Sequence, residues 1–251
     1  VSILSGVIIF ILILVIVYII SGKAVKPISE NYRRQKEFIS NASHELKTPI
    51  TVITATAELM EKKIGSNRFT SCIKVQSQKM GRLVNEMLTL SKLSNQEKKP
   101  DDFKQFDISK VIENTTLYFE SRAFEEKKEI ISDIQNNIRF IGNPDKIDEL
   151  TGILLDNSLK YSDEESKIKL YLRLEKGIII LTCQNQCKNF NTDNIPHLFE
   201  RFYRADKSHS KEKEGFGLGL SIAKEIVLLH NGSISVNYKN DVISFTVKFS
   251  I

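Results

Sequence analysis

Residues 38–50 read FISNASHELKTPI, and the fold of the first half of the chain follows from this stretch. Its apolar residues recur every three or four positions. The same spacing continues to residue 64 through Ile39, Ala42, Leu46, Ile50, Ile53, Ala57, Met60 and Ile64. Spacing of this kind places the apolar side chains on one face of an α-helix, as in coiled coils and helical bundles. The pattern therefore predicts a long helix that packs along one seam.

A second apolar run of the same period follows the break Gly65-Ser66-Asn67. Its members are Phe69, Ile73, Met80, Leu83, Met87 and Leu90, and the stripe is widened by Val84 and Leu88. Two such helices joined by a short turn predict an antiparallel hairpin, to which we assign residues 23–93. Because one hairpin cannot cover its own seam, we expect two copies to pair into a dimeric four-helix bundle.

Residues 1–22 carry no charge, and sixteen of the first twenty are Val, Ile, Leu or Phe. A run of about 20 apolar residues matches the thickness of a bilayer core, so we predict a transmembrane helix over 1–22. A cleaved signal peptide fits residues 1–22 less well than a transmembrane helix does, since no basic stretch precedes the apolar run. Lys23, Lys26 and the following basic residues place 23–251 in the cytoplasm by the positive-inside rule. Because the sequence opens on Val1 rather than Met, we expect a preceding segment.

The composition excludes several classes of protein. Hydrophobic residues make up 41% and charged residues 27% of the 251, which excludes a disordered chain. The net charge of +5 is mild and spread along the chain, so we expect no nucleic-acid partner. Three cysteines are too few for a disulfide framework. A metal site of Cys183 and Cys187 with His197 or His209 is less consistent with the spacing than a buried thiol.

The pattern changes after residues 94–105, which are polar, contain a proline and indicate a linker. In residues 106–251 we expect helices at about 107–128, 144–161 and 218–230, and strands at about 129–135, 138–141, 167–174, 178–185, 233–239 and 242–249. Asn143 and Pro144 mark a helix start, and Asn240-Asp241 a hairpin turn. These elements predict an α/β sandwich with a largely antiparallel sheet, so the whole chain is of the α+β class.

His44 lies two positions from both Ala42 and Leu46, about 200° from either around the helix, and therefore faces away from the apolar seam. Glu45 is adjacent, and Pro49 should bend the helix just beyond the histidine. An exposed imidazole beside a carboxylate is a nucleophile–base arrangement. From spacing alone, an ordinary surface histidine is an equally good interpretation.

Asn157 falls on the apolar stripe of the predicted helix 144–161, seven residues after Leu150. A buried amide there either packs between helices or faces a ligand or ion, and Lys160, one turn later, is able to reach phosphate oxygens. Residues 215–220, GFGLGL, precede another helical run. Glycines at a helix N-terminus allow backbone N–H groups to approach phosphates, although glycine turns are common.

Four stretches together resemble one family. Residues 38–50 resemble the phospho-acceptor box of membrane sensor histidine kinases, and 154–162 resemble their N box. Residues 199–204 and 215–220 resemble the F box and the second glycine box. The resemblance covers about 27–251 with the motifs in the expected order. It implies a HisKA-type dimerisation and phospho-acceptor domain followed by a GHKL-type ATP-binding domain.

The resemblance also implies roles for single residues. His44 would take the γ-phosphoryl group of ATP and pass it to an aspartate in the receiver domain of a response regulator. Glu45 would polarise the imidazole, and Glu45 and Thr48 would support dephosphorylation of the partner. Asn157 would coordinate Mg²⁺, and residues 204–216 would form a mobile lid. The implied nucleotide-binding residues are Asn157, Lys160, Tyr161, Asn185, Arg204, Gly215, Gly217, Leu218, Gly219 and Leu220.

One box departs from the family pattern. The first glycine box, Asp-x-Gly-x-Gly, should follow the strand residues 178–184, but Asn185 stands in place of the aspartate and the glycines are absent. An amide oxygen accepts a hydrogen bond without charge assistance, so we expect ATP binding with altered affinity or base selectivity. The departure leaves open a membrane-tethered scaffold with a degenerate nucleotide site. An ATPase of the gyrase and chaperone group is disfavoured, because Ile153 occupies the position of its catalytic glutamate.

Overall fold

The structure is a computed structural model that describes residues 6, 10, 11, 46–63, 65, 67–95, 103–205 and 215–251. The chain divides into two compact units, Val1–Ser91 and Lys92–Ile251. The predicted transmembrane segment 1–22 lies almost wholly outside the described residues. Within the described ranges, none of the helices combines the length and apolar character that a membrane crossing requires.

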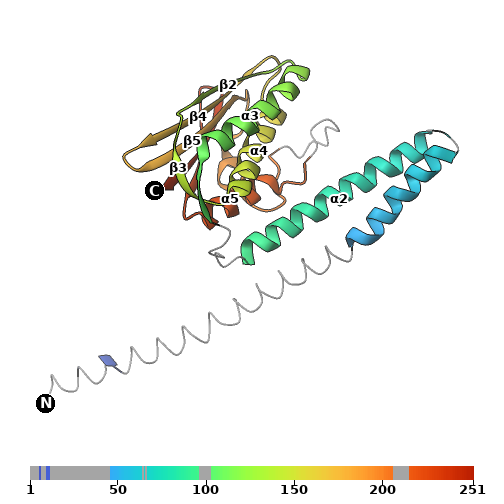
Figure 1. Cartoon of the computed structure of the whole chain (residues 1–251), viewed down its shortest axis with the longest axis horizontal. Helices are drawn as coiled ribbons and strands as arrows, with labels where there is room; N and C mark the ends of the chain where they lie inside the picture. The colour runs from blue at the N-terminus through green and yellow to red at the C-terminus, as the bar shows by residue number, and fades with distance from the viewer. Residues whose placement is uncertain are drawn as a thin grey trace. The chain divides into compact units, whose positions relative to one another are not determined.

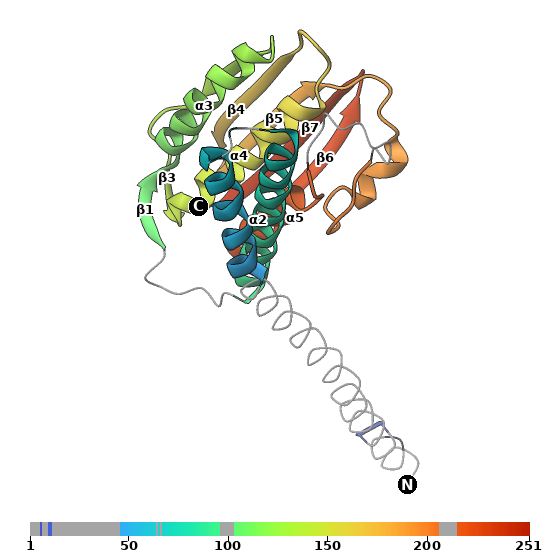
Figure 2. The ribbon, with the colours of Figure 1, turned by 90° about the vertical axis from the view of Figure 1, so that its right-hand side faces the viewer.

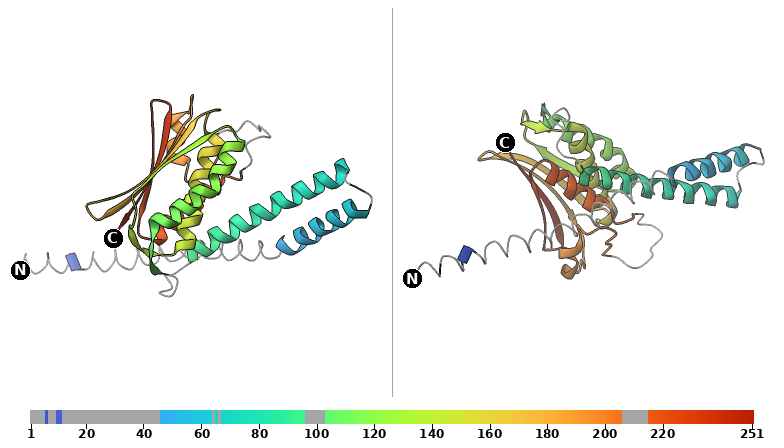
Figure 3. Two further views of the ribbon diagram at one scale, coloured as in Figure 1. Left: turned by 45° about the horizontal axis from the view of Figure 1, so that its top comes forward. Right: turned by 90° about the horizontal axis from the view of Figure 1, so that it is seen from below.

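The first unit contains a helical hairpin, as predicted. Residues 46–63 are helical, and α2 spans Arg68–Asn95. The two helices run antiparallel beside each other and are joined by a short turn (Figure 3). Ile50 of the first helix packs with Val84 and Leu88 of α2 in a buried cluster. The hairpin is therefore held by part of the seam seen in the sequence.

The turn of the hairpin is built by two of the residues in the predicted break. Gly65 adopts a φ of +79°, in the left-handed region that favours glycine. The Oδ1 atom of Asn67 accepts hydrogen bonds from the backbone N–H groups of Phe69, at 2.9 Å, and Thr70, at 3.0 Å. This side chain satisfies two donors that the first turn of α2 would otherwise leave unpaired.

The second unit contains the helices and strands that the sequence predicted, together with one further strand, β1, and a short 3₁₀ helix, η2. In chain order the elements are β1 (Lys104–Asp107), α3 (Ile108–Glu125), β2 (Glu129–Ile134), β3 (Arg139–Gly142), α4 (Pro144–Tyr161), β4 (Lys167–Glu175), β5 (Ile178–Gln186), η2 (Thr192–His197), α5 (Gly219–Leu229), β6 (Ser233–Lys239) and β7 (Val242–Ser250). Strand β1 begins inside the polar segment 94–105, and α2 extends to Asn95.

The main sheet has the strand order β2-β4-β5-β7-β6, and β1 pairs with β3 in a separate two-stranded ladder. The sheet is mixed: β2 and β4 are parallel, and the other three neighbouring pairs are antiparallel. The parallel pair exists because the chain returns from β2 to β4 through β3 and α4, a crossover long enough to restore the strand direction. The expectation of a largely antiparallel sheet holds for every pair except this one.

Helices α3, α4 and α5 cover one face of this sheet (Figures 1 and 2). Along β5 the residues alternate, and Ile179, Leu181, Cys183 and Asn185 are buried beneath the helices. The opposite face of the sheet carries partly exposed and polar residues. The unit is therefore a two-layer α/β sandwich whose core lies between the helices and one sheet face.

Local signals in the sequence set the start of α4 and the last hairpin. The side chain of Asn143 caps α4 by accepting from the backbone N–H of Lys146 at 3.1 Å, and Pro144 occupies the first turn. Asn240 and Asp241 both have positive φ, 53° and 57°, as a tight two-residue turn between β6 and β7 requires. Both predictions are confirmed.

Candidate functional site

The C-terminal half of α4 carries three of the residues singled out in the sequence, Asn157, Lys160 and Tyr161, and all three are half-buried. The ammonium group of Lys160 donates to Oδ2 of Asp156, one turn earlier, at 2.6 Å. Asn157 lies one turn after Ile153 and therefore on the same side of α4. Ile153 in turn faces the start of α5, since a Cβ at Gly219 would lie 3.5 Å from its Cγ2 atom.

Asn185 has a buried acceptor for which the described part of the chain provides no partner. The residue is 1% exposed and lies on the face of β5 that the helices cover. Its Nδ2 atom donates to the backbone carbonyl of Gln186 at 3.2 Å, whereas Oδ1 has no hydrogen-bond partner among the described residues. Because an unsatisfied buried acceptor is costly, this oxygen fits a donor that a ligand supplies, such as an exocyclic amino group.

The loop before α5 requires glycine at one position. Gly217 has a φ of +73°, and a Cβ there would lie 2.6 Å from the carbonyl oxygen of Tyr203 and 2.8 Å from the carbonyl carbon of Phe202. The backbone N–H of Phe202 donates to the Gly217 carbonyl at 2.9 Å. The loop and the segment 199–204 are therefore locked together backbone to backbone, which no side chain at 217 would permit.

Among the residues that the structure describes, no side chain caps the N-terminus of α5. Leu218, the capping residue, is fully buried and makes no side-chain capping bond. The hydroxyl of Ser221 donates to the Leu218 carbonyl at 2.7 Å, so it does not cap the N–H groups either. The N-terminal N–H groups of a helix and its dipole favour an anion. With Asn157 on the neighbouring face of α4, this end of α5 offers a phosphate-binding arrangement.

Burial raises the pKa of the Cys183 thiol to about 11, although a hydrogen-bond contact with the Ser158 hydroxyl at 3.2 Å lowers it in part. Cys183 is thus a buried thiol, as predicted, and Cys187 is half-buried. Among the described residues, no group of three His, Cys, Asp or Glu side chains is arranged to hold a metal ion.

Several other residues singled out in the sequence belong to other segments or are outside the described residues. His44 and Glu45 are outside them, and so are 206–214, which make up most of the expected lid. Thr48 is exposed on the helix 46–63. Arg204 is half-buried at the end of the segment that contacts Gly217, and Gly215 is exposed.

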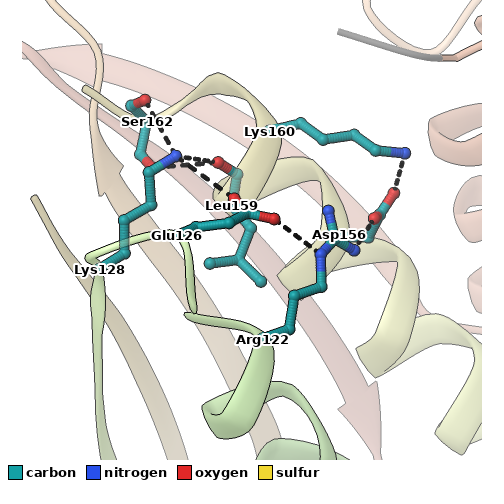
Figure 4. Close-up of polar contacts among 7 residues, drawn as sticks. All are labelled: Arg122, Glu126, Lys128, Asp156, Leu159, Lys160 and Ser162. Atoms are coloured by element: carbon teal, nitrogen blue, oxygen red, sulfur yellow. Dashed lines mark hydrogen bonds and ion pairs between the residues drawn. The ribbon is translucent and has the colours of Figure 1, made fainter. Parts of the chain in front are cut away.

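A charge network beside the C-terminal half of α4 was not predicted (Figure 4). Arg122 of α3 donates from Nη1 to Oδ1 of Asp156 at 2.6 Å and from Nε to Oε1 of Glu126 at 2.8 Å. Lys128 donates to the carbonyl of Leu159 at the end of α4. The Asp156–Lys160 pair was visible in the sequence as an i,i+4 spacing, but its link to Arg122 depends on how α3 packs against α4.

Comparisons with known families agree with this arrangement. Residues 34–96 match the family described as His Kinase A (phospho-acceptor) domain, HisKA. Residues 142–251 match the family described as histidine kinase-, DNA gyrase B-, and HSP90-like ATPase, HATPase_c. The two matches follow one another in the same order as the two compact units.

The chain is also similar to individual proteins. It is 35% identical over 227 residues to the sensor protein DltS of Streptococcus agalactiae serotype III (strain NEM316), covering 90% of this chain and 57% of DltS. The fold resembles full-length ShkA in complex with AMPPNP, with a TM-score of 0.72 and 18% identity over 85% of this chain and 45% of that one. It also resembles the histidine kinase ThkA in complex with the response regulator TrrA, with a TM-score of 0.60 and 19% identity over 88% of this chain and 64% of that one. The chain spans about half the length of the curated relatives it matches.

Proposed function

Because this chain belongs to the sensor histidine kinases and carries their HisKA and HATPase_c domains, we propose that it phosphorylates itself on His44. The phosphoryl group would come from ATP and pass on to an aspartate in the receiver domain of a response regulator. One observation carries the proposal: the phospho-acceptor family matches residues 34–96, and His44 is the single histidine of the sequence in that range.

The residues of the second unit fit ATP. The unpartnered Oδ1 atom of Asn185 suits the amino group of adenine, and the uncapped N-terminus of α5 suits the phosphates. Lys160 would add a cation for the phosphate oxygens. Asn157 would be a ligand of Mg²⁺, which would neutralise charge on the phosphates during transfer.

Phosphoryl transfer depends on positioning and electrostatic stabilisation rather than on covalent chemistry by the protein. In this account the α5 N-terminus and Lys160 hold the terminal phosphate group. The His44 imidazole would attack the γ-phosphorus of ATP in line with one ring nitrogen, so that the P–N bond forms as the bond to the bridging oxygen breaks and ADP leaves. Glu45 would accept a hydrogen bond from the N–H of the other ring nitrogen, which keeps the attacking nitrogen unprotonated. Thr48, four residues after His44, would help to orient water for dephosphorylation of the response regulator.

Homodimerisation is part of the proposal and is supported by the unequal burial of the hairpin seam. Ile50 and Ala57 are buried within one copy, whereas Leu46, Ile53 and Met60 are 46%, 44% and 46% exposed. These three residues recur every seven positions, so they form a stripe along one helix face. A second copy of the hairpin would cover this stripe and complete a four-helix bundle.

We further propose that residues 1–22 anchor the chain in the cell membrane, with 23–251 in the cytoplasm. The support is the uncharged apolar run and the basic residues that follow it. Fractionation of cells that express the full chain tests this proposal. We expect the chain in the membrane fraction, and we expect it to stay there after washes with high salt and with alkali. Release by either treatment contradicts the anchor.

The kinase proposal is tested by incubating the full chain with γ-³²P-labelled ATP and Mg²⁺. We expect label on the protein that is stable in alkali and lost in acid, as for phosphohistidine, and that passes to a receiver domain. His44→Gln should abolish the label. The matched control is His197→Gln, which changes an exposed histidine paired with Glu200 and should leave labelling unchanged. Equal labelling of His44→Gln and the wild type would contradict the proposal.

A further inference from the structure

The ammonium group of Lys160 is held on the side of α4 that faces α3. It donates to Asp156, which contacts Arg122 of α3 (Figure 4). Asn157, by contrast, shares its face of α4 with Ile153, beside the start of α5. Lys160 is four residues from Asp156 and three from Asn157, so its long side chain is able to reach either side. The phosphate position of the proposed function and the observed position of the ammonium are therefore different.

Among the described residues, Asp156 forms ion pairs with two cations, Arg122 and Lys160. The free energy needed to release Lys160 therefore depends on whether Arg122 stays bound. The Oδ1 atom of Asp156 accepts from Arg122 and its Oδ2 atom from Lys160, each at 2.6 Å. The Asp156 side chain is only 32% exposed, so losing both cations would leave a poorly solvated carboxylate without a partner. If Lys160 leaves, Arg122 remains, and Arg122 is itself fixed by Glu126 at 2.8 Å.

We propose that Lys160 is an exchangeable phosphate ligand, which Asp156 holds in the absence of nucleotide and which moves to the phosphates of ATP when the nucleotide binds. Arg122 is the positioning residue that keeps the free-energy cost of this exchange low, because it stays bound to Asp156 after Lys160 has left. The inference rests on the proposed ATP site and adds two residues that do not touch the nucleotide to the determinants of its affinity.

The exchange predicts effects of opposite sign for two neighbouring substitutions. Asp156→Asn removes the competitor for Lys160, so ATP should bind about two- to five-fold more tightly, the range that a partly exposed ion pair supports. Arg122→Gln leaves Lys160 as the remaining cation on Asp156, so ATP should bind about two- to five-fold more weakly. Arg122→Lys keeps a cation there and should restore most of the wild-type affinity.

The experiment measures the dissociation constant of ATP on the full chain by displacement of a fluorescent trinitrophenyl-ATP, with adenosine as a ligand without phosphates. Each variant is measured with Lys160 and again with Lys160→Gln. The matched control is Glu149→Gln, which removes the carboxylate of another ion pair on α4, Lys146–Glu149 at 2.7 Å, with similar exposure. Thermal unfolding of each variant reports any change in fold.

We expect the two opposite shifts for ATP, no shift for adenosine, no effect of Glu149→Gln and loss of both shifts in the Lys160→Gln background. Shifts that persist without Lys160 would show a general effect of charge and overturn the inference, as would equal ATP affinity in all variants. In either case the wild type still binds ATP and the proposed function stands. Failure of the wild type to bind ATP would instead overturn both.

Discussion

The two units of the chain differ in how far their aliphatic side chains are buried. In the sandwich, Leu150, Leu154 and Leu159 of α4 are fully buried by the sheet and the other helices of the same copy. In the hairpin, Leu46, Ile53 and Met60 stay exposed although they belong to an equally regular apolar stripe. The described residues of the sandwich therefore complete their core in one copy, whereas the described residues of the hairpin leave this stripe uncovered. Under the proposed function, the contrast separates the unit proposed to bind nucleotide from the unit proposed to assemble with a second chain.

The largest effect should come from placing a charge in the exposed stripe of the hairpin. Ile53→Lys would bury an unpaired ammonium from each chain in the dimer, at about 4 kcal/mol or more, which corresponds to a roughly thousandfold weaker association. Analytical ultracentrifugation of the detergent-solubilised chain measures this. The control is Val52→Lys, one position away, exposed and off the stripe, which should leave association unchanged. A dimer of normal strength in Ile53→Lys would remove the distinction between the units.

Truncation of a side chain in the core of the sandwich should lower the stability of this unit whether or not a second copy of the chain is bound. Leu154→Ala creates a cavity at a fully buried position, so we expect the free energy of unfolding to fall by about 3 kcal/mol. Urea unfolding at several protein concentrations measures it, and the loss should not depend on concentration. Leu117→Ala, on the exposed side of α3, should cost below about 0.5 kcal/mol. A concentration-dependent loss in Leu154→Ala would mean that the sandwich is also completed by another chain.

A smaller effect is expected at the unpartnered acceptor of β5. Asn185→Asp replaces a neutral acceptor by a charged one, and charge-assisted hydrogen bonds are about twice as strong. We expect ATP to bind about five-fold more tightly, which corresponds to about 1 kcal/mol. Isothermal titration with ATP and GTP measures affinity and base preference together. Unchanged binding of both nucleotides would mean that residue 185 does not contact the base.

The smallest effect is expected for an ion pair across the hairpin. Glu61 accepts from Lys74 Nζ at 3.3 Å, and the Lys74 side chain is partly solvated. Glu61→Gln should lower the stability of the hairpin by below about 1 kcal/mol and leave ATP affinity unchanged. Thermal unfolding followed by circular dichroism is sufficient to detect it. A loss as large as that of Leu154→Ala would show that the hairpin relies on this pair rather than on its apolar seam.

Elements with strong local signals could be predicted from the sequence. The bounds of α4 follow from the cap of Asn143 and from Pro144, and the β6–β7 turn follows from Asn240 and Asp241. Strand β1 could not be predicted, because it is a short strand in a two-stranded ladder and lies in a polar segment. The parallel pairing of β2 with β4 is set by the crossover through α4, which no single stretch of sequence encodes.

The candidate site likewise has features that the sequence predicted and features that it did not. The helical spacing placed Asn157 and Lys160 on α4, whereas Asn185 was singled out only by the resemblance, and its burial on β5 is seen only in the structure. The ion pair between Arg122 and Asp156 joins residues 34 positions apart, so it depends on the packing of α3 against α4. The contact of Gly217 with the backbone of Tyr203 likewise appears only when the loop is folded.

Under the proposed function, ATP bound to the sandwich phosphorylates His44 of the hairpin. The most direct measurement is mass spectrometric mapping, at neutral pH, of the phosphate on the full chain after incubation with ATP and Mg²⁺. We expect a single phosphorylated residue, His44, and no phosphate on an Asn157→Ala chain. Phosphate on a serine, threonine or other histidine, or an unmodified chain that nevertheless binds ATP, would contradict it.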